Sequence, residues 1–301
     1  MIVSDGALQY IPFSALPAPE NPREPLIVGH EIVNLPSASV LAEIRLASAG
    51  RPTATREVAV LADPVFDAND ERVVSTSDGS VQRPAFTRPD RRISRSASDV
   101  GLAGKSGLYL ERLTYSRAEA EAILAVTPHG RALGALDFQA NRAMALSPEL
   151  ARYRIVHFAT HGFLDSKRPE LSGLVLSLVN RQGKPQDGFL GLEDVYNLKL
   201  PVDLVVLSGC QTGLGEEISG EGLIGLTRGF MYAGASRVVA SLWSVDDFTT
   251  SQLMAKFYRA MERDKMPPAA ALRKAQIEMW RHRGWQAPYY WAAFQVQGEW
   301  K

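Results

Sequence analysis

The sequence predicts an α/β fold in which helices cover both faces of a mostly parallel central sheet. From residue 109 onward, strand-like and helix-like segments alternate along the chain, which is typical of parallel strands joined by helical crossovers. The strand-like segments are continuously apolar, as in Ile155-Val156 and Val205-Val206-Leu207, rather than alternating between apolar and polar residues. Continuous apolar strands indicate burial on both faces of the sheet.

Residues 1–66 predict a smaller N-terminal α/β portion. Strand-like runs bounded by Pro, Gly and Asp lie at 25–29 and 57–62. A helix is expected over 37–49, because either of two serines at its start can act as N-cap and apolar side chains recur on one side.

Residues 67–107 predict a long mobile loop. The segment is rich in Asp, Arg, Ser and Pro and carries little apolar periodicity. Such a composition cannot bury enough apolar surface to offset the entropy lost when a chain is ordered. We therefore divide the chain into an N-terminal portion at 1–66, the loop at 67–107 and a core at 108–301.

Helix and strand signals alternate through the core. Ser116 followed by Glu119 predicts a capping box, Asp137 predicts the N-cap of the next helix, and Gly234 predicts a helix end. We expect strands over 154–160, 172–178, 203–208, 237–242 and 290–296, and helices over 116–125, 137–146, 192–198, 220–234, 247–263 and 267–281.

The composition is that of a globular protein without a global charge. Hydrophobic residues make up 46% and charged residues 22% of the chain, and 33 basic residues balance 33 acidic ones. A balanced charge provides no field that would attract nucleic acid or an anionic membrane. The single cysteine excludes an intrachain disulfide and a thiolate metal cluster. Without an apolar run of about 18 residues or a signal-peptide pattern, we expect a cytoplasmic protein.

Two predicted strands each end in a reactive side chain followed by a glycine-containing turn. One run, Asp203-Leu-Val-Val-Leu-Ser-Gly-Cys210, ends in the cysteine, and the other, Arg154-Ile-Val-His-Phe-Ala-Thr-His161, ends in a histidine. Carboxyl ends of parallel strands meet at one edge of a sheet, where ligand clefts open. Because a thiol needs a base to become a good nucleophile, the sequence predicts the dyad of a cysteine peptidase.

The predicted dyad assigns a role to each group. His161 would accept the thiol proton and later protonate the leaving amine, while the backbone N–H groups of Gly162 and Cys210 would hold the oxyanion. The competing interpretation of Cys210 is a buried, unreactive cysteine beside an apolar strand. His157 is a rival base, but its place inside a strand favours a buried histidine with satisfied ring nitrogens. No cofactor or catalytic metal is expected, because the spacing of the two histidines suits a zinc pair only on a helix.

Asp246 and Asp247 follow the predicted strand at 237–242. We expect one of them to act as the N-cap of the helix that starts there. We expect the other to face the cleft, because it too lies past the carboxyl end of a strand. A partly buried carboxylate at that position would select a basic substrate side chain.

Several motifs, taken in order, resemble the CHAT domain family. They are His-Phe-Ala-Thr-His161-Gly162, Asp-Leu-Val-Val-Leu-Ser-Gly-Cys210-Gln-Thr-Gly, Gly-Glu-Gly222, Ala-Gly-Ala-Ser-Arg-Val-Val-Ala-Ser-Leu-Trp-Ser-Val-Asp-Asp247 and Tyr-Tyr-Trp-Ala-Ala-Phe294. The segments 5–16 and 63–66 also resemble the N-terminal portion of that family. The resemblance therefore covers nearly the whole chain outside 67–107, and it implies a caspase–haemoglobinase-like fold.

The resemblance also implies a function, a regulated cysteine endopeptidase that cleaves a protein partner through a dyad of Cys210 and His161. CHAT domains are often found behind TPR repeats in bacteria, which implies a TPR or other regulatory region in a longer protein. Separase is a distant relative, and Asp247 takes the place of a separase aspartate that contacts a substrate arginine, which favours a basic P1 residue. A non-catalytic interaction module and a thiol acyltransferase or other amide hydrolase remain alternatives, because they share the fold or the dyad.

Overall fold

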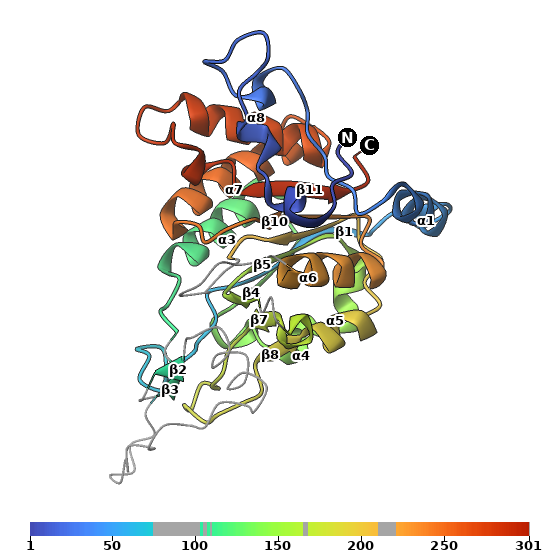
Figure 1. Ribbon diagram of the computed structural model, residues 1–301. Coiled ribbons are helices and arrows are strands. Elements are labelled where there is room, and N and C mark those ends of the chain that lie inside the picture. The colour runs from blue at the N-terminus through green and yellow to red at the C-terminus, as the bar shows by residue number, and fades with distance from the viewer. Residues whose placement is uncertain (75–102, 105–106, 109, 165–167, 210–220, 301) are drawn as a thin grey trace.

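The computed structural model describes residues 1–74, 103–104, 107–108, 110–164, 168–209 and 221–300. Its central sheet has the strand order β11-β10-β9-β5-β1-β4. These strands are β1 (Arg56–Ala62), β4 (Ala132–Leu136), β5 (Tyr153–Ala159), β9 (Leu204–Leu207), β10 (Arg237–Ser241) and β11 (Phe294–Gly298). All neighbouring pairs are parallel except β10 and β11, which confirms the predicted mostly parallel α/β sheet (Figure 1).

Helices cover both faces of this sheet, as the continuous apolar strands predicted. The side chains of Val58 and Val60 in β1 belong to one core, and those of Ala59 and Leu61 belong to a second core on the opposite face. The first core is covered by α3 (Thr114–Val126), α7 (Asp247–Glu262) and α8 (Pro268–Arg281). The second is covered by α1 (Ala38–Ser48), α4 (Arg142–Ala145), α5 (Leu192–Asn197) and α6 (Glu221–Tyr232) (Figure 1).

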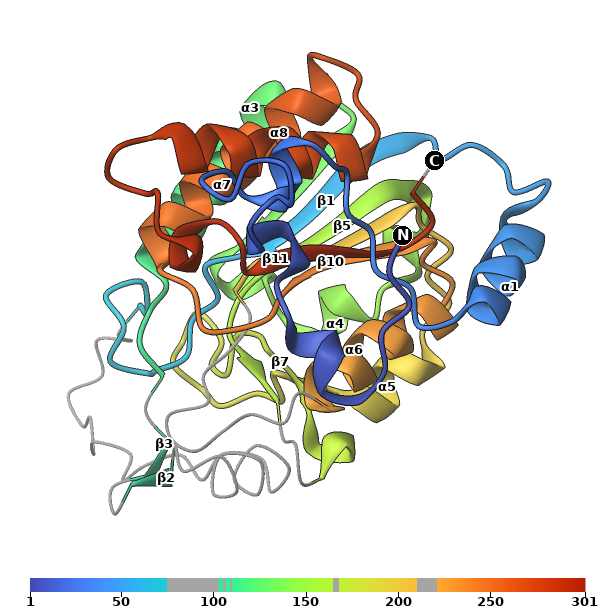
Figure 2. The same cartoon turned by 45° about the horizontal axis from the view of Figure 1, so that its top comes forward.

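The N-terminal portion extends the antiparallel edge of the sheet. Asn34 donates its backbone N–H to the carbonyl of Val296 in β11, and both chain ends lie near this strand (Figure 2). The predicted helix over 37–49 is confirmed by α1, whose N-cap Ser37 accepts a hydrogen bond from the N–H of Val40.

The strand predicted over 25–29 is wrong, because residues 26–28 form a 3₁₀ helix. Its middle residue, Ile27, is buried in the first core, and Arg273 of α8 donates to the carbonyls of Ile27 and Val28. A short apolar run fits a buried strand and a buried turn equally well, so its hydrophobicity could not separate the two.

Two predicted helix starts are also wrong. α3 begins after Leu113, and the hydroxyl of Ser116 lies inside the helix and donates to the Leu113 carbonyl. Glu119 is therefore not part of a capping box. Asp137 caps no α-helix either. It has a positive φ of 53° and begins a 3₁₀ turn, and α4 starts later with Asn141 as its N-cap.

A small antiparallel sheet follows β5 directly. It consists of β6 (Gly162–Phe163), β7 (Gly173–Val175) and β8 (Phe189–Gly191). The strand predicted over 172–178 is thus present but shorter. The edge strand β4 was not predicted, because its small residues Ala132, Gly134 and Ala135 give no strong apolar signal.

Most of the segment predicted to form a mobile loop, at 67–107, lies outside the described residues. Its first part, residues 67–74, forms turns with hydrogen bonds such as Val73 N–H to the Asp70 carbonyl. Near the end of the segment, the two-residue strands β2 (Ala103–Gly104) and β3 (Gly107–Leu108) pair with each other. Among the described residues, no helix is both long and apolar enough to cross a bilayer.

Candidate functional site

A cavity of about 160 Å³ lies at the carboxyl ends of β5, β9 and β10. It is lined by Leu113, Ser116, Glu119, Ala159, His161, Ser208, Gly209, Ser244, Val245, Asp247 and Thr250. The sheet brings together residues that are far apart in the sequence, because the three parallel strands end side by side at this edge. An engineered protein cavity of about 150 Å³ holds a benzene molecule, so this one has room for a side chain.

His161 lines the cavity just beyond β5. Its Nε2 lies 2.6 Å from the backbone carbonyl of Glu111, and its ring centroid lies 5.2 Å from that of Phe66. A carbonyl can only accept a hydrogen bond, so Nε2 carries the proton and Nδ1 holds the lone pair of the neutral ring. Burial lowers the pKa of His161, which keeps the ring neutral near pH 7.

Gly209 lines the same cavity at the end of β9. A Cβ atom at this position would lie 2.2 Å from the carbonyl oxygen of Thr160, so only glycine allows the two strand ends to approach so closely. The next residue, Cys210, lies outside the described residues, as do all residues to 220. Its roles as nucleophile and as oxyanion donor therefore stay predictions.

Gly162, the other predicted oxyanion donor, begins β6 directly after His161. It pairs with Leu174 of β7 and is buried. The carbonyl of His161 accepts a hydrogen bond from the N–H of Val175 in the same small sheet. This pairing fixes the backbone on both sides of the histidine, and the oxyanion role of Gly162 stays a prediction.

The two neighbouring aspartates lie in different surroundings. Asp246 is exposed and is the N-cap of α7, where its carboxylate accepts a hydrogen bond from the N–H of Thr249. Asp247 lines the cavity and accepts a hydrogen bond of 2.8 Å from the N–H of Tyr115. Burial, and then the nearby negative charge of Glu119, raise the pKa of Asp247 to about 6.

His157, the rival base, is fully buried inside β5. Its Nδ1 lies 2.9 Å from the hydroxyl of Tyr258, and its Nε2 lies 3.0 Å from the hydroxyl of Ser208. Glu119 Oε1 also lies 2.7 Å from Nε2. Both ring nitrogens thus have partners, as predicted for a buried histidine with satisfied ring nitrogens.

A buried ion-pair network lies close in the chain to Glu111 and Phe66, two residues that contact the His161 ring. The fully buried carboxylate of Asp63 pairs with Arg72 at 3.0 Å, with Arg112 at 2.8 Å and with Arg117 at 2.8 Å. Arg72 lies near the start of the segment predicted as a loop, and Arg112 lies just beyond its end, in the predicted core. Sequence reasoning missed this network, because its partners are scattered through an irregular part of the chain.

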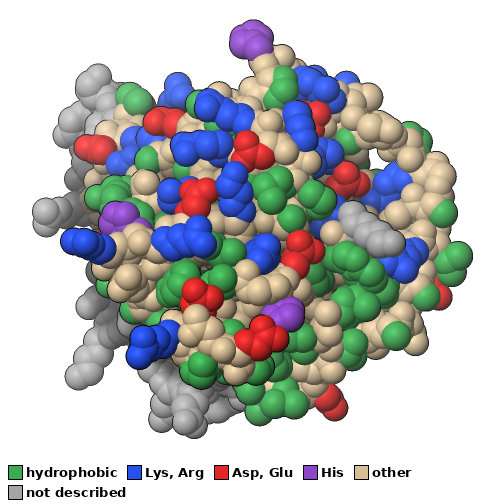
Figure 3. All heavy atoms as spheres, turned by 90° about the horizontal axis from the view of Figure 1, so that it is seen from above, with side chains coloured by type: hydrophobic (Ala, Val, Ile, Leu, Met, Phe, Trp, Pro, Cys, Tyr) green, Lys and Arg blue, Asp and Glu red, His purple; other side chains and the backbone are tan. Residues whose placement is uncertain are grey.

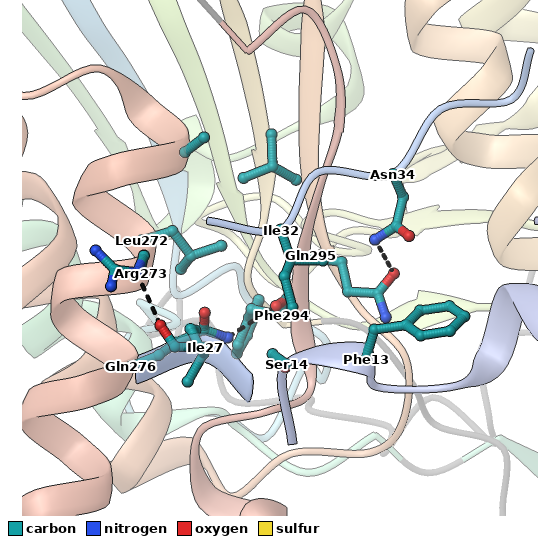
Figure 4. Close-up of a pocket in the computed structure, with 12 residues that line it drawn as sticks. Phe13, Ser14, Ile27, Ile32, Asn34, Leu272, Arg273, Gln276, Phe294 and Gln295 are labelled. Atoms are coloured by element: carbon teal, nitrogen blue, oxygen red, sulfur yellow. Dashed lines mark hydrogen bonds between the residues drawn. The ribbon is translucent and has the colours of Figure 1, made fainter. Parts of the chain in front are cut away.

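A second, smaller cavity lies between the N-terminal segment, α8 and β11. It measures about 20 Å³ and is lined by Ser14, Asn34 and Arg273 among others (Figure 4). There the side-chain amide of Asn34 donates to the side-chain Oε1 of Gln295 at 2.8 Å. This volume is close to that of one water molecule and far too small for a side chain, so the larger cavity is the candidate site.

The described residues contain no group of three or more His, Cys, Asp or Glu that could hold a metal ion.

On the face that carries α7 and α8, basic and acidic side chains are interspersed (Figure 3). This mixture agrees with the balanced charge of the sequence.

The family model described as CHAT domain matches residues 1–299. Human tetratricopeptide repeat protein 28 is 34% identical over 113 residues, and its mouse counterpart is 32% identical over 105 residues. These matches cover 38% and 35% of this chain and only 4% of each relative's length.

Among solved structures, the chain is similar to separase in a separase–securin complex from Saccharomyces cerevisiae, with 11% identity and a TM-score of 0.46. That match covers 89% of this chain and 14% of the other. It is also similar to the Arg-specific cysteine proteinase gingipain R, with 8% identity and a TM-score of 0.44, over 82% of this chain and 46% of the other.

Proposed function

The chain belongs to the CHAT domain family, and on that basis we propose that it is a regulated cysteine endopeptidase acting through Cys210 and His161. The observation that carries this proposal is the state of His161. The histidine is buried at the edge of a side-chain-sized cavity, neutral near pH 7, and held by the Glu111 carbonyl so that Nδ1 can accept a proton. A general base needs these properties.

The proposed reaction follows from these groups. Nδ1 of His161 accepts the thiol proton of Cys210, and the thiolate attacks the scissile carbonyl carbon. The N–H groups of Gly162 and Cys210 donate to the oxyanion that forms. The C–N bond then breaks as the imidazolium returns its proton to the leaving amine, and water later hydrolyses the thioester. The Glu111 carbonyl keeps the imidazole in the required tautomer, so no carboxylate is needed as a third member.

Asp247 supports a preference for a basic P1 residue. Its carboxylate lines the cavity that holds His161, whereas Asp246 is engaged as a helix cap. A basic side chain bound beside Asp247 would favour its ionised form, because an opposite charge lowers a carboxyl pKa.

The proposed partner is a protein substrate. We also propose that a TPR or other regulatory region controls the site in a longer protein, because the matched relatives are named for tetratricopeptide repeats. This chain spans only about 4% of their length, so most of each relative lies outside the match.

The test combines a diverse peptide library with covalent labelling. Wild-type protein is incubated with the library and with an acyloxymethyl ketone that carries arginine at P1, and cut sites and adducts are mapped by mass spectrometry. We expect an adduct on Cys210 and cuts after basic residues. Both should be lost in Cys210→Ala and fall about 100-fold or more in His161→Gln.

The matched control is His129→Gln, because His129 is an exposed histidine away from the cavity. Each variant must keep the wild-type thermal transition. Equal labelling of wild type and His161→Gln would contradict the dyad. A folded protein that neither cuts nor reacts would favour the non-catalytic interaction module.

A further inference from the structure

Glu119 is the acidic residue of the cavity that the proposed mechanism does not use. It was predicted to be part of a capping box, but it lies inside α3, is 2% exposed and lines the cavity. Burying a carboxylate without a cation is costly, so a buried acid that lines a cavity requires a physical explanation.

Within the described part of the chain, the compensation that Glu119 receives comes from one ring nitrogen of His157. Among the described residues, its Oε1 has no hydrogen-bond partner, although it lies 2.7 Å from Nε2 of His157. That nitrogen already forms a hydrogen bond with the Ser208 hydroxyl. Among the described residues that line the cavity there is no lysine or arginine. The nearby Arg117 is bound to Asp63 and Asp137.

Asp247 adds a second carboxylate from a different helix. It approaches the cavity from the start of α7, whereas Glu119 approaches from α3, and these two helices pack against each other. The charge of Glu119 is one cause of the raised pKa of Asp247, which shows that the two carboxylates share a local negative potential. A cation between them would relieve this repulsion.

We propose that Glu119 and Asp247 together bind the guanidinium group of one substrate arginine, with the buried Glu119 as the specificity-determining residue. Two carboxylates on different helices suit a planar group with five donors that point in several directions. A guanidinium is also less strongly hydrated than an ammonium, so its burial costs less. This inference rests on the proposed function for the peptide nature of the ligand and adds arginine selectivity over lysine.

The test measures binding rather than catalysis. Cys210→Ala protein is titrated by calorimetry with N-acetyl-arginine amide, N-acetyl-lysine amide and the neutral isostere N-acetyl-citrulline amide. We expect arginine to bind about 10- to 100-fold more tightly than citrulline, the range for a charged hydrogen-bond pair, and more tightly than lysine. Glu119→Gln in this background should remove most of the preference for arginine over citrulline. The control Glu121→Gln changes an exposed acid on the same helix and should leave the preference unchanged.

A second variant covers the case in which Glu119→Gln does not fold. Glu119→Asp keeps the charge but withdraws it from the cavity, so it should shift preference from arginine amide toward the longer homoarginine amide. An arginine preference that survives both variants would overturn the inference, and so would equal binding of arginine and citrulline by the Cys210→Ala protein. Because no bond is cleaved, Glu119-dependent binding without any peptidase activity in wild type would uphold this site and refute the proposed reaction. Peptide cleavage after arginine that is unchanged in Glu119→Gln would uphold the proposed reaction and refute this site.

Discussion

Replacing Asp247 with asparagine should stabilise the protein near neutral pH and have little effect near pH 4. The pKa of Asp247 is raised from its ordinary value of 3.8 to about 6 in the folded protein, chiefly by burial and then by the charge of Glu119. Between these two pH values the folded protein holds the Asp247 proton more tightly than the unfolded chain does. Each rise in pH across that window therefore lowers the free energy of unfolding.

The size of the effect follows from the pKa difference. For a fully buried group it corresponds to about 3 kcal/mol, at about 1.36 kcal/mol per pH unit. Asp247 is only partly buried and is therefore screened by solvent, which reduces the expected gain in Asp247→Asn to about 1–2 kcal/mol at pH 7.5. The asparagine carbonyl can still accept the hydrogen bond from the N–H of Tyr115, and the loss of a negative charge from the first turn of α7 offsets only part of the gain.

The assay is urea unfolding, followed by tryptophan fluorescence at several pH values between 4 and 8. The difference between Asp247→Asn and wild type cancels the titration of all other groups to first order. Asp246→Asn is the matched control, because asparagine caps a helix as well as aspartate does, and removing a negative charge from a helix start is slightly unfavourable. Parallel curves for Asp247→Asn and wild type would refute the reasoning that Asp247 ionises in a buried, negatively charged cavity.

Two further predictions concern stability and the shape of the site. Asp63→Asn leaves three arginines around a neutral buried group and should lower the free energy of unfolding by about 3–5 kcal/mol in denaturant titrations. The control Glu71→Gln alters an exposed partner of Arg112 and should change the free energy of unfolding by less than about 0.5 kcal/mol. Gly209→Ala should cost about 1–3 kcal/mol, because its Cβ would overlap the backbone of Thr160, and it should slow labelling of Cys210. Gly225→Ala places a Cβ at an ordinary contact distance within α6, so a loss as large as that of Gly209→Ala would contradict this explanation.

The sheet was predictable because strands that are buried on both faces are continuously apolar in sequence, as in the run Val205-Val206-Leu207. The different positions of Asp246, which caps α7, and Asp247, which lines the cavity, were also partly predictable. Adjacent residues at a helix start point in different directions, so only one can cap, although the helix-start signals alone did not assign which one does. Glu119 was misjudged because its spacing from Ser116 satisfies a local capping rule. That rule uses only neighbouring residues, whereas α3 begins earlier and packs against α7.

The partner of His161 was beyond sequence reasoning for a different reason. A backbone carbonyl exists at every residue, so the acceptor role of Glu111 depends only on where its segment lies. That segment is held by the buried carboxylate of Asp63, since Arg112 follows Glu111 directly and pairs with Asp63 at 2.8 Å. Phe66, which packs on the His161 ring, follows Asp63 by three residues. The proton position on the proposed base therefore depends on an ion-pair network outside the cavity, and changes in that network should alter the site as well as the stability of the fold.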